Sequence, residues 1–179
     1  MYIIETPRLR LLACDLQMVS LLIEDVHRFE SVYGLSLVDQ WTSFGTDPLN
    51  YTLKLLSDPT QANWWTYLPV LKAKNLVIGT CGYKGKPDDL NRVEIGYEIA
   101  PSFRQNAYGL ELAKALILDA FQNRQVDSIL AHTLPHENAS TAILKHCGMQ
   151  FISSIEDPED GLIWKWELQK TDWLTKQPN

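Results

Sequence analysis

A short polar segment past the middle of the chain has the composition of an anion-binding turn. It reads R-Q-N-A-Y-G (residues 104–109) and lies between a strand-like segment, 93–100, and a long amphipathic pattern. The first backbone N–H groups of a helix have no internal partner, and the helix dipole places partial positive charge there. Arg104 adds a full charge at the mouth of this turn. The segment therefore predicts a site for a phosphate or pyrophosphate.

Two glutamates occupy the strand-like segment that precedes this turn, V-E-I-G-Y-E-I-A. Glu94 and Glu98 are separated by an even number of residues, so both point to the same side of the strand. A carboxylate on a covered central strand loses hydration, which raises its pKa toward values useful for a general base. The alternative is that one or both pair with Arg92 or Lys84 on a solvated face of the sheet.

Two common phosphate loops do not fit this segment. A Walker A loop requires Gly-Lys-Ser/Thr, which is absent, and a dinucleotide fingerprint requires three spaced glycines early in the chain. Other reactive residues give weaker signals. Cys14, Cys81 and Cys147 have neither metal-ligand spacing nor the pattern of a disulfide framework. We interpret His132 as structural, because no acid is paired with it in the sequence.

Composition sets the class of protein. With 179 residues, 45% of them apolar, the chain is long enough for one well-packed domain, 1–179, and short for two. A net charge of −6 argues against nucleic-acid binding and is compatible with cationic partners. No apolar run is long enough to cross a membrane, and no signal peptide is visible, so we expect a cytoplasmic protein without a membrane partner.

The elements that must position these residues follow from hydrophobic periodicity. The first half predicts a strand within residues 3–13, a helix from Asp15 to about Phe29, and a short helix that begins at Asp47-Pro48. Three strands at 64–72, 76–83 and 92–100 should then form an antiparallel meander, because only short loops join them.

The second half begins with the longest clean helix, which follows the polar turn. The strand at 126–133 must pair in parallel with the strand before that helix, since a crossover helix separates them. A helix stopped by Gly148 and two strands at 149–155 and 162–168 close the fold. We expect the tail, 169–179, to be polar and frayed apart from Trp173. The order is β-α-α-β-β-β-α-β-α-β-β.

This order, with two motifs, resembles the GNAT superfamily of N-acetyltransferases. The polar turn is similar to the family's pyrophosphate loop, Q/R-x-x-G-x-G/A, although Ala107 replaces its first glycine. The segment P-H-E-N-A-S-T-A-I-L-K-H-C-G-M (135–149) and the opening E-T-x-R-L-x-L resemble the ribosomal-protein N-terminal (RimJ/RimL-like) branch. The resemblance implies an α+β fold with a mixed, mostly antiparallel sheet of about seven strands and about four helices.

The resemblance also implies a coenzyme site for acetyl-CoA. The turn would hold the pyrophosphate through Arg104, Gln105, Asn106, Ala107, Tyr108, Gly109 and Leu110. The pantetheine arm would pair like an extra strand with Ile99 and Ala100, and Asn138 would contact the arm, cap its own helix, or do both. An alanine is unstrained at position 107 only if its φ is helical.

Catalytic roles follow from the same resemblance. We favour Glu94 as the general base, acting directly or through water, with Glu98 as the alternative. Many members carry a tyrosine that acts as the general acid, and Leu144 occupies its position here. Ser140 matches a serine of the ribosomal branch and is therefore the candidate proton donor to the leaving thiolate. Its alternative role is that of a helix cap. The acceptor would contact Trp41, Phe44 and Tyr51, unless these aromatics only cover the core.

The function implied is an acetyl-CoA-dependent N-acetyltransferase that acts on a primary amine by direct transfer in a ternary complex. The acceptor is either a protein N-terminus or a small amine such as a polyamine, an aminoglycoside or an amino acid. The alternative is a CoA-binding regulatory or sensor module without turnover. A plain nucleotide-binding domain is disfavoured, because the first half lacks a phosphate loop. We expect no metal site and a monomer or homodimer.

Overall fold

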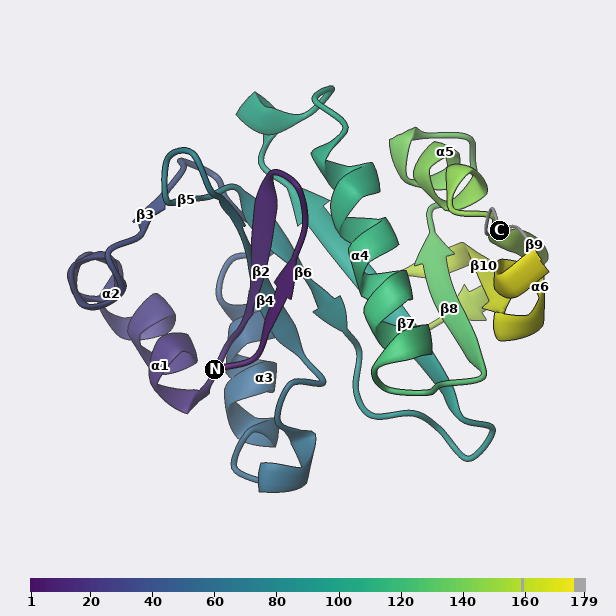
Figure 1. Cartoon of the computed structure of the whole chain (residues 1–179), viewed down its shortest axis with the longest axis horizontal. Coiled ribbons are helices and arrows are strands. Elements are labelled where there is room, and N and C mark those ends of the chain that lie inside the picture. Colours follow the sequence, from purple (N-terminus) through teal and green to yellow (C-terminus); the bar gives the residue numbers. More distant parts are fainter. Residues whose placement is uncertain (159, 176–179) are drawn as a thin grey trace.

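The computed structural model describes residues 1–158 and 160–175, which form a mixed sheet with helices on both faces (Figure 1). The sheet order is β1-β2-β4-β6-β7-β8-β10-β9, and the short strands β3 and β5 pair beside β4. The strands are β1 Ile3–Glu5, β2 Leu9–Ala13, β3 Ser36–Leu37, β4 Thr66–Leu71, β5 Leu76–Val77, β6 Gly79–Tyr83, β7 Arg92–Ile99, β8 Ser128–Thr133, β9 Gln150–Asp157 and β10 Gly161–Gln169.

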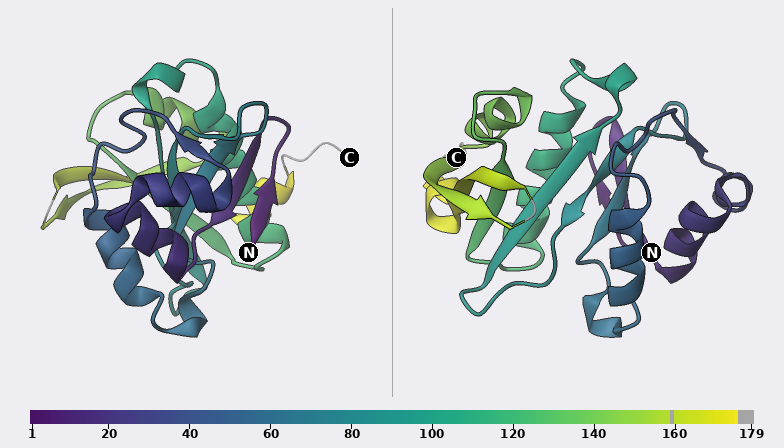
Figure 2. Two further views of the ribbon diagram at one scale, coloured as in Figure 1. Left: turned by 90° about the vertical axis from the view of Figure 1, so that its left-hand side faces the viewer. Right: turned by 180° about the vertical axis from the view of Figure 1, so that it is seen from behind.

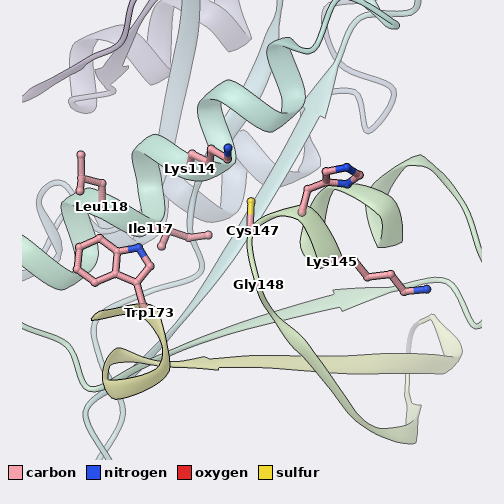
Figure 3. Close-up of a pocket in the computed structure, with 8 residues that line it drawn as sticks. Lys114, Ile117, Leu118, Lys145, Cys147, Gly148 and Trp173 are labelled. Atoms are coloured by element: carbon pink, nitrogen blue, oxygen red, sulfur yellow. The ribbon is translucent and has the colours of Figure 1, made fainter. Parts of the chain in front are cut away.

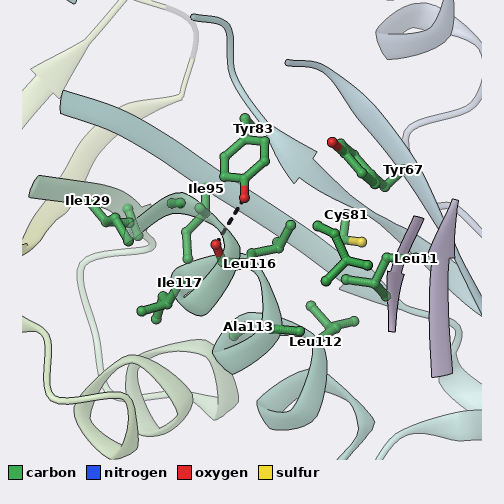
Figure 4. Close-up of a cluster of buried hydrophobic side chains, with 14 of the residues drawn as sticks. Leu11, Tyr67, Cys81, Tyr83, Ile95, Leu112, Ala113, Leu116, Ile117 and Ile129 are labelled. Atoms are coloured by element: carbon green, nitrogen blue, oxygen red, sulfur yellow. Dashed lines mark hydrogen bonds between the residues drawn. The ribbon is translucent and has the colours of Figure 1, made fainter. Parts of the chain in front are cut away.

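Helix α4, Tyr108–Gln122, lies across one face of the sheet and organises the larger core. Its buried residues recur at helical spacing, and Leu112, Leu116 and Ile117 pack against strand residues such as Ile95 and Ile129 (Figure 4). The hydroxyl oxygen of Tyr83 on β6 lies 2.9 Å from the Leu116 carbonyl oxygen. The polar turn at 104–109 is thereby fixed at one end of a rigid helix.

The other face of the sheet carries the first three helices. These are α1 Leu16–Glu24, α2 Val26–Tyr33 and α3 Asp47–Leu55. Met18, Val19 and Phe29 pack there with Leu68 and Val70 of β4 in a second core. The right-hand view of Figure 2 shows this side of the molecule. The loop between β3 and α3 belongs to the same side.

The two central strands, β7 and β8, pair over a short segment and then diverge. Residues 92–94 of β7 pair in parallel with residues 128–130 of β8, and the pairing ends there. Residues 95–99 of β7 therefore have no strand partner on the β8 side among the described residues. The predicted parallel pairing across α4 is confirmed, and so is the antiparallel order β4-β6-β7. The separation of β7 from β8 after Glu94 could not be predicted from the sequence.

The predicted fold class is confirmed, while several element boundaries are wrong. The described residues form ten strands and six α-helices rather than seven and four. The first predicted helix is two helices, because the Asp25 side chain accepts from the Arg28 N–H and starts α2. Helix α3 begins at Asp47, as predicted, and its N-cap is Thr46, whose side chain makes no capping hydrogen bond.

The chain after β10 also differs from the expected frayed tail. Residues Lys170–Thr175 form helix α6, and the indole of Trp173 is buried against Phe121 of α4. The remainder of that predicted tail, 176–179, lies outside the described residues. None of the described helices combines the length and the hydropathy required to span a bilayer.

Candidate active site

The polar turn before α4 presents a row of backbone donors. Gln105 and Ala107 have left-handed φ angles of 62° and 59°, with Asn106 between them at negative φ. Alternating left- and right-handed residues turn successive N–H groups toward one point and form an anion-binding concavity. Within the described residues, no acceptor pairs with the N–H groups of residues 105–110. The turn therefore has the donors that a diphosphate requires.

Ala107 precedes the first residue of α4 without any side-chain cap. A left-handed alanine is strained, because its Cβ approaches the backbone, whereas glycine adopts this conformation freely. An alanine would be unstrained at position 107 only with a helical φ, and the φ of Ala107 is left-handed instead. The strain is concentrated at the candidate binding turn.

Two arginines flank the turn. Arg104 Nε donates to the Ile99 carbonyl at 2.9 Å, which brings its guanidinium back toward the end of β7. Arg8, which the sequence did not single out, donates from Nη1 to the Asn106 carbonyl at 3.0 Å and stacks over Tyr108. Its charge is balanced by Glu111 at 2.6 Å. Arg104 has no carboxylate partner among the described residues and is the free cation of the turn.

Gly109 allows α5, Ala139–His146, to approach α4 closely. A Cβ at this position would lie 2.9 Å from Cδ1 of Ile143 and 3.9 Å from Cγ1 of Ile99. The contact places Ile143, in the second turn of α5, beside the start of α4 and the end of β7.

The unpaired edge of β7 begins next to the polar turn. The Glu94 carbonyl accepts from the N–H of Lys84, directly after β6, and the Ala100 N–H donates to the Ile78 carbonyl. The backbone groups of Ile95, Tyr97 and Ile99 alternate with these and therefore face the β8 side. The Ala100 N–H is therefore already satisfied. Of the two predicted pairing positions, Ile99 faces the opening, and its carbonyl is held by Arg104.

Helix α5 begins at the same opening. Asn138 is its N-cap: Oδ1 accepts from the Thr141 N–H at 3.0 Å, within a capping box, and Nδ2 donates to the His136 carbonyl. The alternative role as a cap is thus present. Ser140 Oγ lies 3.3 Å from the hydroxyl of Tyr97 on β7, and burial raises the pKa of Tyr97 to about 12. This pair of hydroxyls bridges β7 and α5.

The opposite side of β7 holds a cluster of charged groups. Oε1 of Glu94 lies 2.5 Å from Nζ of Lys84 and 3.0 Å from Nδ1 of His132 on β8. Neither contact has the directionality of a hydrogen bond, since this oxygen has no such donor among the described residues. Burial raises the pKa of Glu94, but His132 and Lys84 outweigh it, so its pKa lies below the ordinary value.

This result corrects two expectations from the sequence. The expected increase in the pKa of Glu94 is wrong, because two cationic neighbours offset the loss of hydration. The statement that His132 lacks a paired acid is also wrong. The acid is 38 residues away in the chain and adjacent across the two central strands.

Glu98 lies nearer the polar turn and holds the loop that precedes α3. Both of its carboxylate oxygens accept from the Ser43 N–H, at 3.0 and 3.1 Å. Of the expected acceptor contacts, Phe44 follows Ser43 and is 64% exposed, Trp41 packs on the second core, and Tyr51 is exposed with its ring edge against Trp65. Glu98 and Phe44 are thus in one region, and Tyr51 belongs to the adjacent helix.

A cavity of about 590 Å³ lies away from the divergence of β7 and β8, between α4, the end of α5 and α6 (Figure 3). Its lining includes Lys114, Lys145, Cys147 and Trp173. Burial outweighs the effect of Lys114 and raises the pKa of the Cys147 thiol to about 11. Cys147 is therefore not poised as a thiolate nucleophile.

These features match a known family. A family profile described as "Acetyltransferase (GNAT) domain" matches residues 15–150. The chain belongs to this family. Its coenzyme is acetyl-CoA, and the free N–H groups of the polar turn with Arg104 fit a diphosphate.

The chain is similar to a curated protein and to two solved structures. The N-acetyltransferase YjdG of Bacillus subtilis, itself described as uncharacterized, is 26% identical over 140 residues, covering 77% of this chain and 83% of that protein. The ribosomal-protein-S5-alanine acetyltransferase of Vibrio fischeri has a TM-score of 0.70 at 13% identity, covering 99% of this chain and 100% of the other.

RimL, a ribosomal L7/L12 α-N-protein acetyltransferase solved with coenzyme A, has a TM-score of 0.68 at 16% identity, covering 94% and 98% of the two chains. At such identities the structural likeness shows the shared fold.

Proposed function

We propose that this protein is an acetyl-CoA-dependent N-acetyltransferase of a primary amine, either a protein N-terminus or a small amine. The observation that carries the proposal is the combination of free N–H groups at 105–110 with an unpaired strand edge that begins beside them. Acetyl-CoA, when bound, supplies the acetyl group as a thioester. The remaining chemistry is assigned to side chains of this chain.

The polar turn would hold the diphosphate through six backbone N–H groups and Arg104. The backbone groups of Ile95, Tyr97 and Ile99 would bind the pantetheine amides as a neighbouring strand does. Asn138 is a candidate contact to the same arm. A β7 N–H that faces the opening would also stabilise negative charge on the thioester oxygen.

Protonation of the leaving thiolate is assigned to the Ser140–Tyr97 pair of hydroxyls. Ser140 was the sequence candidate, and Tyr97 reaches the same place from β7, so a tyrosine is present although position 144 holds leucine. The raised pKa of Tyr97 keeps its proton available at neutral pH. We assign Ser140 as the direct donor and Tyr97 as its partner.

The acceptor amine would enter from the side of β7 that carries Glu94 and Glu98. An alkylamine has a pKa near ~10 and arrives protonated, so two carboxylates on one face favour its approach. Glu98 also holds the Ser43–Phe44 segment, which we assign to the acceptor wall with Trp41 and Tyr51. A carboxylate of lowered pKa such as Glu94 is a weak base on its own.

The test is release of CoA thiol from acetyl-CoA with a panel of acceptors: peptides with N-terminal alanine or serine, spermidine, and an aminoglycoside. We expect turnover with at least one acceptor, and loss of acetyl-CoA binding when Arg104 and Gln105 are both replaced by aspartate. Tight binding of acetyl-CoA without turnover on any acceptor contradicts the enzyme proposal.

A CoA-binding sensor is the second candidate. The strained Ala107 in place of the motif glycine and the lowered pKa of Glu94 favour it. A sensor predicts acetyl-CoA affinity at least equal to that of an enzyme, with no acetylated product by mass spectrometry.

We propose a cytoplasmic monomer or homodimer built as one domain, which sedimentation and fractionation would test.

A further inference from the structure

His132 occupies the point at which the two central strands separate. Leu130 is the last β8 residue paired with β7, opposite Glu94, and His132 lies two residues further on the same face. Its ring contacts Glu94 through Nδ1 at 3.0 Å. The other ring nitrogen, Nε2, is buried and has no hydrogen-bond partner in the part of the chain that the structure describes.

The charges around this ring are arranged asymmetrically. Glu94 of β7 lies beside Nδ1, and Lys84, directly after β6, contacts the same carboxylate oxygen. Glu98 shares the face of Glu94, and Lys165 of β10 lies directly opposite His132 in the antiparallel register. The lowered pKa of Glu94 keeps it ionised, and a carboxylate beside Nδ1 favours the tautomer that carries its proton there. Nε2 is then left with a free lone pair.

A buried polar atom without a partner lowers stability, and a catalytic role is one of the reasons for which proteins retain such an atom. The His132 side chain is 19% exposed, and no strand bonds tie β8 to β7 beyond Leu130, although β10 pairs with β8 at His132 on the other side. The Glu94 contact is not directional in the free protein. Such contacts tighten in the substrate complex.

We propose that His132 is the catalytic base of the reaction and that Glu94 is its positioning residue. The inference rests on the proposed transferase function. Nε2 takes a proton from the acceptor ammonium group, and the freed lone pair forms the C–N bond as the C–S bond of acetyl-CoA breaks. Ser140 donates its hydroxyl proton to the departing thiolate and takes up the second proton of the nitrogen, and the imidazolium returns the first proton to water.

The test is kcat/KM against pH for thiol release, with the panel acceptor that turns over fastest. Replacing His132 by Gln should lower kcat/KM by about 100-fold or more and remove the acidic limb of the profile. Replacing Glu94 by Gln removes a negative charge, so the limb should move to lower pH with about a tenfold loss. Replacing Lys84 by Gln removes a positive charge and should move the limb to higher pH.

The matched control is His27→Gln. His27 faces Glu30 at 3.6 Å in a similar pair, but its side chain is 97% exposed on α2. This variant should keep the rate and the pH profile of the wild type. Acetyl-CoA affinity should be unchanged in His132→Gln, because the base does not contact the polar turn.

The outcomes separate this inference from the proposed function. If the wild type binds acetyl-CoA but acetylates no acceptor, both are overturned. If the wild type turns over and His132→Gln stays within threefold of it, only the role of His132 is overturned. If His132→Gln does not fold, Glu94→Gln and Lys84→Gln decide. Shifts of the acidic limb in opposite directions in these two variants support the role, and pH profiles identical to that of the wild type overturn it.

Discussion

The polar groups at the two ends of helix α4 differ in their hydrogen bonding: in the described part of the chain, those at one end are fully paired, and the backbone N–H groups at the other are not. At the carboxyl-terminal end, Asp119 is 2% exposed, and each of its oxygens accepts two hydrogen bonds. The donors are Tyr2, Tyr83, Asn123 and Arg124. At the amino-terminal end, no acceptor within the described residues pairs with the N–H groups of 105–110, and two residues have left-handed φ.

The difference separates stability from function along one helix. Arg124 is stacked on the rings of Tyr2, Trp64 and Tyr83, and it donates to the Tyr67 hydroxyl, so four parts of the chain are tied at one point. A fully satisfied buried network rigidifies its surroundings. The polar turn leaves its donors unused and keeps its strain, which is the state that an anionic ligand would relieve.

The largest effect should follow from breaking the satisfied end. Replacing Asp119 by Ala leaves Arg124 buried without its counter-ion, so we expect a loss of about 3–5 kcal/mol in the free energy of unfolding, measured by urea denaturation. The folded fraction should bind acetyl-CoA as the wild type does. The control is Asp89→Ala, an exposed position, expected within about 0.5 kcal/mol. A loss under about 1 kcal/mol would contradict the assigned role.

Acid should weaken the same end. Burial raises the pKa of Asp119, but the hydrogen bonds from Tyr2, Arg124 and other donors outweigh it, so its pKa in the folded state is lowered. Its contribution is fully present above the ordinary Asp pKa, near ~3.9, and is lost as the pH falls through the lower folded value. The free energy of unfolding should decline from about pH 5 downward, and less steeply in Asp119→Asn. Equal slopes would refute the linkage.

A smaller effect is expected at the binding end. Replacing Arg104 by Gln removes the free cation of the polar turn and should weaken acetyl-CoA binding about tenfold, equivalent to about 1.4 kcal/mol, as measured by calorimetry. The free energy of unfolding should hardly change, because Arg104 is exposed. Arg28→Gln on α2 is the charge-matched control. Equal affinities in the two variants would remove Arg104 from the site.

The smallest effect is a gain. Ala107→Gly should relieve the left-handed strain and raise the free energy of unfolding by up to about 1 kcal/mol, without loss of acetyl-CoA affinity. Ala142→Gly, in the exposed middle of α5, should have the opposite sign, because glycine there only adds backbone entropy to the unfolded chain. If both variants are destabilised equally, position 107 is not strained.

Local patterns in the sequence were sufficient to predict the fold class and the polar turn. The periodicity of α4 and the polar residues before it are encoded within a few turns of chain. The pairs His132–Glu94 and Ser140–Tyr97 are not, because each joins residues about forty positions apart whose contact depends on strand register. The break at Asp25 was missed because a cap inside an apolar pattern does not interrupt its periodicity.

The brief pairing of β7 with β8 has a mechanical consequence. Three residue pairs join a half-sheet of seven strands to one of three, and α4 bridges the seam. A ligand that pairs with the remaining edge of β7 would bridge the two half-sheets, so binding of the cofactor should stabilise their association. Amide hydrogens of Ile95, Tyr97 and Ile99 would then exchange rapidly in the free protein and slowly once the seam is filled.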